Sequence, residues 1–193
     1  MEIIVFDPQP ARNNLLPLTY TRPVGDLRIG ITTISEKWQR LLPGEYSWAT
    51  EPYLGELFPC CADTHSALFV AGNVVPDANL AAAVATLGEN ESLHCGDTIV
   101  ARRGDGQRRR DYTGEPPVVL QHVYDIFLNN GKVICADFEA ITAGRTSQPL
   151  SPTVQVIGPR ELVFVEEGAS LECCVLNTTH GPIYIGQGAT VME

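Results

Sequence analysis

One hexapeptide pattern occurs twice near the end of the chain, and this repeat limits the fold of that region more than any other feature. The two copies are Val165–Leu171 and Ile185–Val191, and each places Gly-Ala-Ser or Gly-Ala-Thr between aliphatic residues. This periodicity is typical of a β-helix, in which each strand and turn forms one side of a coil. The small residues fit the corners and the aliphatic side chains point inward. The alternative is a chance pair of β-hairpins with glycine turns.

The repeat predicts more coil than this sequence holds. A solenoid needs about three or more repeats to bury its core, and the sequence ends two residues after Val191. We therefore expect a truncated coil, or one that something else completes.

The sequence before residue 149 follows a different pattern, in which short apolar strands alternate with helices. Residues 2–6 and 67–71 are buried-strand patterns, and Thr33 with Glu36 forms a capping box for a helix to Leu42. This alternation predicts an α/β fold with a mostly parallel, Rossmann-like sheet and helices on both faces. We place an α/β domain at 1–148 and the beginning of a β-helix at 149–193. The other expected elements are a helix at 77–87, a strand at 92–101 that enters a hairpin with its tip at 104–106, and helices at 121–130 and 133–142, closed by Gly131 and Gly144.

Charge and composition exclude several classes of function. The 193 residues carry a formal net charge of -10, and an acidic chain lacks the basic face that non-specific nucleic-acid binding needs. The first residues contain no basic segment before an apolar core, so they predict a strand rather than a signal peptide. The longest apolar stretch, Leu80–Leu87, is far shorter than the roughly 20 residues that span a bilayer. We expect a cytoplasmic protein without a nucleic-acid or membrane partner.

The cysteines and histidines show no spacing that is typical of a metal site. Cys60-Cys61 and Cys173-Cys174 are adjacent pairs, and no C-x-x-C motif occurs among the six cysteines. We expect buried, reduced thiols, and we assign the four histidines no catalytic role.

Residues 14–24 (NLLPLTYTRPV) and 27–34 (LRIGITTI) resemble the signature loop of the sugar nucleotidyltransferases, and more closely that of the divergent GlmU-like sugar nucleotidyltransferases of bacteria. The resemblance covers essentially the whole chain. It implies a nucleotidyltransferase-type domain followed by a left-handed β-helix. It also implies a nucleoside triphosphate and a sugar 1-phosphate as substrates, Mg²⁺ as cofactor, and homo-oligomers that form through the β-helix.

The chain departs from the family pattern where the family carries its charged groups. The Gly-x-Gly that offers backbone amides to the nucleotide phosphates is absent, and Asp7-Pro8-Gln9-Pro10 lies nearby. Asn14 takes the place of the arginine, Val24 the place of the lysine, and Asn73 the place of the metal-binding aspartate in Gly-Asp. An amide oxygen lacks the charge that a hard cation such as Mg²⁺ favours. Either other residues compensate or the domain has lost the chemistry.

Three arginines in or beside the loop could supply the missing charge, because a guanidinium suits bidentate contact with phosphate. The alternative for each is a solvated arginine, or one paired with an acid such as Asp26. We take Arg22 and Arg28 as candidate catalytic phosphate contacts. Asp7 could hold a metal or a nucleobase, or only form a turn before proline. The candidate substrate-binding residues are Asp7, Arg12, Asn14 and Thr19, and the candidate metal ligand is Asn73.

A second basic cluster, formed by Arg102-Arg103 and Arg108–Arg110, flanks a Gly-Asp-Gly tip. Such a cluster typically keeps an exposed edge soluble. The alternative is a contact with an anionic partner or a neighbouring subunit.

Three functions follow from these observations. The leading hypothesis is a sugar-1-phosphate nucleotidyltransferase that makes an NDP-sugar of the UDP-GlcNAc or dTDP-glucose type and pyrophosphate. The second is a catalytically inactive domain that binds a nucleotide or sugar nucleotide, or acts as a scaffold for the β-helix. In the third, the activity belongs to an acyltransferase-like β-helix.

Overall fold

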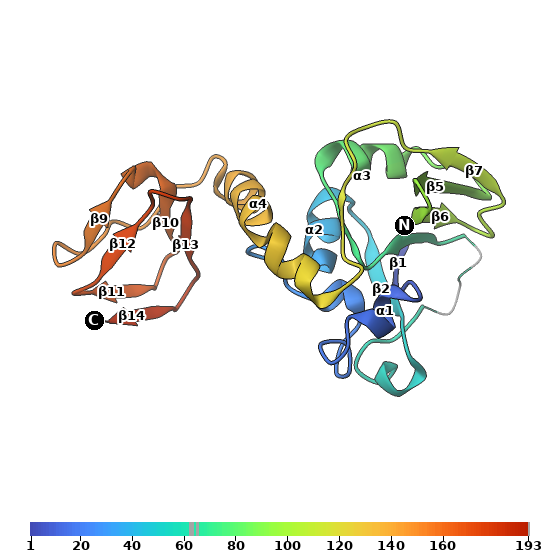
Figure 1. Cartoon of the computed structure of the whole chain (residues 1–193), viewed down its shortest axis with the longest axis horizontal. Helices are drawn as coiled ribbons and strands as arrows, with labels where there is room; N and C mark the ends of the chain where they lie inside the picture. Colours follow the sequence, from blue (N-terminus) through green and yellow to red (C-terminus); the bar gives the residue numbers. More distant parts are fainter. Residues whose placement is uncertain (62–63, 65, 193) are drawn as a thin grey trace. The chain divides into compact units, whose positions relative to one another are not determined.

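The computed structural model describes residues 1–61, 64 and 66–192. The chain divides into two compact units, Met1–Asn129 and Asn130–Glu193, and the division falls within helix α4 (Val123–Thr142). Figure 1 shows a sheet with short helices in the first unit and short strands arranged in pairs in the second. The domain boundary predicted at residue 148 stays a prediction.

The first unit is built on a sheet with the strand order β2-β1-β3-β6-β5-β7, and a separate ribbon pairs β4 with β8. Its strands are β1 Glu2–Phe6, β2 Glu45–Ala49, β3 Leu68–Ala71, β4 Val74–Val75, β5 Glu91–Cys95, β6 Thr98–Arg103, β7 Arg108–Asp111 and β8 Val118–Val119. Its helices are α1 Ala11–Asn14, α2 Ile34–Leu41 and α3 Ala78–Ala85, with 3₁₀ helices η1 Val24–Asp26 and η2 Pro52–Leu54.

The central sheet is mostly parallel, as the alternation of strands and helices predicts. The pairs β1–β2, β1–β3 and β5–β7 are parallel, whereas β3–β6 and β5–β6 are antiparallel. The first unit is therefore a mixed α/β domain with few helices.

The core of the first unit surrounds β1, which lies between two parallel neighbours. Ile3, Ile4 and Val5 are all fully buried, which explains the continuous apolar run, because a central parallel strand is covered on both faces. Phe69 and Ala67 join Ile4 in one buried cluster, and the partly buried hydrophobic residues against it are Phe6, Ala49 and Cys61. Cys61 belongs to the segment before β3, so a connection contributes to a face where we expected a helix.

Helices α2 and α3 begin where local capping signals predict, whereas α4 does not end where its glycine predicts. Thr33 and Glu36 form the predicted capping box of α2, and Asp77 caps α3 by accepting a hydrogen bond from the Leu80 amide at 2.7 Å. The prediction of two helices at 121–130 and 133–142 is wrong. One helix, α4, continues through Gly131, because an isolated glycine costs a helix only about 1 kcal/mol.

The prediction of one strand at 92–101 is also wrong. This segment forms parts of two antiparallel strands, β5 and β6, and Gly96 in the turn between them has φ +58°. Residues 104–106 lead from β6 to β7, which pairs with β5 rather than with β6. The Gly96-Asp97 dipeptide is the turn signal that divides this segment.

The second unit contains the end of α4 and three parallel strand pairs. Each residue of β10 pairs with the residue twenty positions later in β13, for example Val163 with Ile183. The pairs β9–β12 and β11–β14 have the same spacing. The strands are β9 Gln155–Ile157, β10 Val163–Val165, β11 Ser170–Glu172, β12 Val175–Asn177, β13 Ile183–Ile185 and β14 Thr190–Met192, and a 3₁₀ helix η3 spans Arg160–Leu162.

All three pairs contribute to one apolar interior, around which they lie in Figure 1. Val165, Leu171 and Leu176 are buried in it, and the residues that pair with them, Ile185, Val191 and Val156, are partly buried. Gly168 and Gly188, the glycines of the two repeats, have φ values of +81° and +69°. The repeated glycine therefore serves a turn conformation that other residues rarely adopt.

The segment before β9 covers one edge of these strands with polar side chains. Gln148 donates through Nε2 to the Ala169 carbonyl and accepts from the Gly168 amide, both at 2.9 Å. Ser147 Oγ accepts from the Val165 amide at 2.9 Å. Backbone groups that an edge strand would leave unpaired are thus satisfied locally.

The sequence predicts that the chain does not span a membrane and that its cysteines are buried. Within the described residues, α4 and the shorter helices all lack the combination of length and apolar character that crossing a bilayer requires. All six cysteines are free; Cys60, Cys135 and Cys173 are exposed and the other three are partly exposed, so the expectation of buried thiols is wrong.

Two glycines allow η1 to approach the ends of β1 and β3. A Cβ on Gly72 would lie 2.7 Å from the Gly25 nitrogen and 3.1 Å from the Phe6 carbonyl oxygen. A Cβ on Gly25 would lie 2.6 Å from Val5 Cγ1. These contacts leave no space for a side chain, so the loop can reach the sheet only with glycine at both positions.

We expect Gly72→Ala to lower the free energy of unfolding by about 1–3 kcal/mol, since backbone must move to admit the methyl group. Gly131→Ala is the control, because a Cβ there meets nothing within 4 Å and alanine favours a helix by about 0.5–1 kcal/mol. Urea denaturation followed by circular dichroism measures both. Equal effects of the two substitutions would contradict the close approach.

Candidate functional site

A hollow of about 440 Å³ lies at the carboxyl ends of β1 and β3. Within the sheet, β2 lies on one side of β1 and β3 on the other, so the direction in which strands are added reverses at β1. Ligands of open α/β sheets bind at such a switch point, outside the carboxyl ends of the strands. The hollow is lined by residues 6–11, Asn73, residues 97–99 and Gln121.

Asp7, the first residue after β1, is held by three donors. Its Oδ2 accepts from Arg12 Nη1 at 2.7 Å and from Thr50 Oγ1 at 2.6 Å. Its Oδ1 accepts from the Val24 amide at 2.8 Å. The carboxylate therefore ties the end of β1 to the loop before η1 and to the end of β2.

Arg12 faces inward rather than towards solvent. The side chains of Arg12 and Asp7 are both only 4% exposed, and they form a salt bridge of 2.7 Å. Arg12 also donates to the Thr19 carbonyl at 2.8 Å and to Tyr53 Oη at 3.0 Å. The loop cation is thus committed to contacts within the protein, which leaves it little capacity to bind a phosphate.

Burial raises the pKa of Asp7, because the charged form loses its water. The hydrogen bonds from Thr50 and Val24 and the charge of Arg12 oppose that rise. Burying the Asp7 carboxylate therefore carries a desolvation cost, which Thr50, Val24 and Arg12 partly offset.

The structure brings Asp7, Arg12 and Thr19 together and leaves Asn14 apart. Thr19 is fully buried, and its hydroxyl donates to the Arg12 carbonyl at 3.0 Å. Asn14 is exposed at the end of α1. The substrate-binding roles of these four residues stay predictions.

Arg22 and Arg28 are the exposed cations of the loop. Arg28 donates to the carbonyl oxygen of Ile31. Burial raises the pKa of Asp26, and the nearby charges of Arg22 and Arg28 lower it. Both arginines thus act on Asp26 electrostatically, and both face solvent where an anion could reach them.

Lys37 is a residue of this region that the sequence analysis did not single out. It is 1% exposed, and its Nζ donates to the Ile29 carbonyl at 2.7 Å and to the Thr32 carbonyl and hydroxyl at 2.9 and 3.0 Å. The buried ammonium orders the loop that carries Arg28. The sequence signal for this burial is that Lys37 lies three residues after Ile34, on the buried face of α2.

Asn73 follows β3 and lines the hollow. Its Nδ2 donates to the Leu120 carbonyl at 3.0 Å, and its own carbonyl accepts from the Leu120 amide at 2.8 Å. Its Oδ1 is buried and has no hydrogen-bond partner within the described residues. The side chain thus presents an unused acceptor at the edge of the sheet.

These residues fit a divalent cation poorly. Mg²⁺ prefers carboxylate oxygens, but both oxygens of Asp7 are occupied and its charge is offset by Arg12. Asp97, on the turn after β5, is the remaining carboxylate that lines the hollow, and it is exposed. In the described part of the chain, no group of three or more His, Cys, Asp or Glu side chains could hold a metal. The Mg²⁺ that the resemblance implies stays a prediction.

The basic cluster lies on β6 and β7, and its arginines are largely engaged. Arg102 lies over the ring of Phe69 with 3.7 Å to the ring centre, and Arg109 donates to Asp111 at 2.8 Å. β7 is the last strand at one edge of the sheet. This position favours the interpretation of an edge kept soluble by charge.

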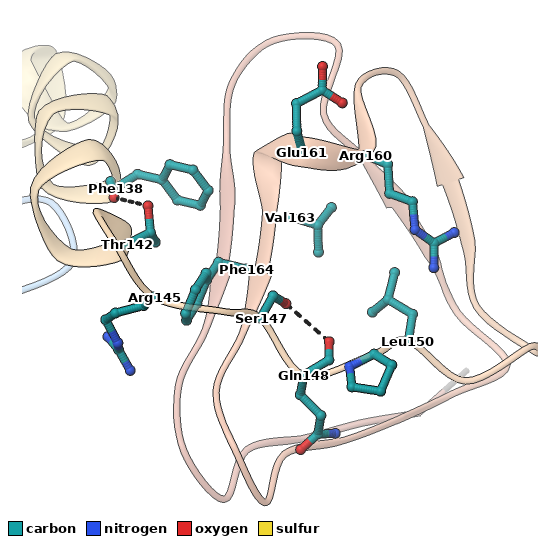
Figure 2. A pocket seen from close by; sticks show the side chains of 11 residues that line it. Phe138, Thr142, Arg145, Ser147, Gln148, Leu150, Arg160, Glu161, Val163 and Phe164 are labelled. Atoms are coloured by element: carbon teal, nitrogen blue, oxygen red, sulfur yellow. Dashed lines mark hydrogen bonds between the residues drawn. The ribbon is translucent and has the colours of Figure 1, made fainter.

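A second hollow, of about 600 Å³, lies within the second unit (Figure 2). Its arginines are Arg145, which donates to Glu166 at 2.7 Å, and Arg160, which adjoins Glu161 in η3. Phe164 lies beneath the Arg145 guanidinium, 5.0 Å from ring centre to Cζ. Glu166 thus offsets the charge of Arg145, whereas Figure 2 shows the carboxylate of Glu161 directed away from the guanidinium of Arg160.

We expect Arg12→Met to lower the free energy of unfolding at neutral pH by about 3–5 kcal/mol, because it leaves the Asp7 carboxylate buried without its cation. Removing Arg12 also removes a charge that lowers the pKa of Asp7. A carboxyl whose pKa is raised in the folded chain costs stability above that pKa, and the cost disappears as the pH falls. The deficit should therefore be smaller at about pH 5 than at about pH 7.5 in urea denaturation.

Arg22→Met is the matched control, since an exposed arginine should change stability by less than about 0.5 kcal/mol. Adding Asp7→Asn to Arg12→Met should restore part of the loss. A deficit that is independent of pH would contradict the role of the pair.

Comparison with known proteins places the first unit in a family. A family model described as sugar nucleotidyl transferase matches residues 3–146, which is well over half of the chain. A search of curated proteins finds no match. The matched segment contains β1, the loop with Arg22 and Arg28, and the whole hollow at the carboxyl ends of β1 and β3. The chain belongs to the sugar nucleotidyl transferase family.

Proposed function

We propose that the first unit is a sugar-1-phosphate nucleotidyltransferase that binds a nucleoside triphosphate and a sugar 1-phosphate at the β1–β3 hollow. The observation that carries the proposal is the position of this hollow, at the switch point of the sheet and inside the family match. UDP-GlcNAc and dTDP-glucose are the product types that we favour.

The reaction is one displacement at phosphorus. A phosphate oxygen of the sugar 1-phosphate attacks the α-phosphorus of the triphosphate and forms the new P–O bond. The bond from the α-phosphorus to the bridging oxygen breaks, and pyrophosphate leaves with that electron pair. Negative charge grows on the phosphoryl oxygens, so fixed cations lower the barrier. Arg22 and Arg28 are the exposed cations of the loop that could serve.

A second candidate function is a non-catalytic domain that binds a nucleotide or sugar nucleotide, or supports the second unit. The Asp7–Arg12 salt bridge favours it, because it commits an acid and a base at the site to structure. Asn73 favours it too, since an amide stands where the resemblance implies a metal-binding carboxylate.

We also propose that the second unit begins a left-handed β-helix of the kind found in the GlmU-like proteins, through which copies of the chain assemble. Its twenty-residue pairing, shared apolar interior and repeated glycine turns support a β-helix. The hand of the coil and the assembly rest on the resemblance alone.

Thermal-shift and calorimetric titration with UTP, dTTP, UDP-GlcNAc and dTDP-glucose tests the proposal, because a ligand at 100 times its Kd stabilises the folded state by about 2.7 kcal/mol. We expect Arg22→Ala or Arg28→Ala to weaken binding of the cognate nucleotide about tenfold or more, as charge-assisted hydrogen bonds to phosphate are lost.

Arg160→Ala, an exposed arginine of the second unit, is the control and should leave binding unchanged. Pyrophosphate release from a bound triphosphate and sugar 1-phosphate then separates the enzyme from the non-catalytic binder. If none of the four nucleotides binds, the enzyme and the nucleotide-binding domain both fail, and the scaffold for the second unit is left.

A further inference from the structure

Asn73 has a fixed orientation that defines what it can offer a ligand. Because Nδ2 donates to the Leu120 carbonyl, the unpartnered atom of the side-chain amide is the acceptor Oδ1. The residue is 1% exposed and lines the hollow beside Gln121. A buried acceptor without a partner is rare in folded proteins and calls for an explanation.

The charged side chains that line the hollow determine whether a cation or a hydrogen-bond donor can bind Asn73 Oδ1. Asp7 is neutralised by Arg12 and already accepts three hydrogen bonds. Asp97 is a single exposed carboxylate. A divalent cation at this point would thus exchange water ligands for one amide oxygen and one exposed carboxylate, whereas an N–H or O–H group needs only one acceptor.

We propose that the ligand of the β1–β3 hollow donates a hydrogen bond from a neutral N–H or O–H group to Asn73 Oδ1, and that the protein holds no divalent cation there. The proposal deepens the proposed function and rests on it for the ligand. Sugar hydroxyl groups and the imide N–H of uracil or thymine are donors of this class. Asn73 is then a binding residue in its own right.

The experiment compares calorimetric binding of UDP-GlcNAc and dTDP-glucose in millimolar Mg²⁺ and in EDTA. For the unsubstituted chain we expect Kd values that agree within about twofold in the two buffers. Asn73→Leu keeps a similar volume and removes the acceptor, so it should weaken binding about tenfold in both buffers. UMP and GlcNAc 1-phosphate separate a donor on the nucleoside from a donor on the hexose, because only the first carries the pyrimidine and the ribose and only the second carries the GlcNAc.

Asn73→Asp is the second variant, and it keeps the proposal testable if Asn73→Leu unfolds. It adds a carboxylate without a counter-ion to the hollow that Asp97 also lines, so it should create a Mn²⁺ site visible by electron paramagnetic resonance. The unsubstituted chain should bind no Mn²⁺ in the same titration. Glu167→Gln, at an exposed acid of the second unit that does not line the hollow, is the matched control and should change neither nucleotide binding nor the Mn²⁺ titration.

Two results would overturn the inference while the proposed function stands. One is nucleotide binding that EDTA abolishes, and the other is Mn²⁺ binding by the unsubstituted chain that Asp97→Asn removes. Unchanged affinity in Asn73→Leu would refute the hydrogen bond. If no nucleotide binds the unsubstituted chain, the proposed function and the ligand contact fail together, and the Mn²⁺ titration alone decides whether a cation binds.

Discussion

The salt bridge between Asp7 and Arg12 is the interaction on which the candidate site depends. It joins the end of β1 to the signature loop through the Val24 amide and the Thr19 carbonyl, and to the segment after β2 through Thr50 and Tyr53. A buried ion pair of this kind contributes little net stability, yet losing one partner is costly. It therefore fixes one arrangement of the loop rather than adding much to its stability.

This arrangement determines which charged residues of the loop are available to bind an anion. Arg12 and Lys37 lie near the candidate phosphate contacts Arg22 and Arg28 in sequence, but both donate to carbonyl oxygens inside the protein. The positive charge that remains for an anion is that of Arg22 and Arg28. A site that uses two of its cations to order its own loop gains a rigid geometry and loses electrostatic attraction, a balance that suits binding at least as well as turnover.

In the second unit, the sequence repeat sets which strands pair. Each strand pairs with the strand twenty residues later, and the inward aliphatic residues of both turns share one interior. Ser147 and Gln148 add polar contacts to the backbone of Val165, Gly168 and Ala169, which belong to the first copy of the repeat.

The sequence by itself determined the elements whose signals are local. The run at residues 2–6, the capping box at Thr33 and the glycine turns of the repeat each have one favourable conformation. The tertiary structure decided the rest: that α4 runs through Gly131, that β7 pairs with β5, and that Arg12 faces Asp7. These outcomes depend on contacts between residues far apart in the chain or on burial, and neither hydrophobic period nor motif spacing records which side chains meet.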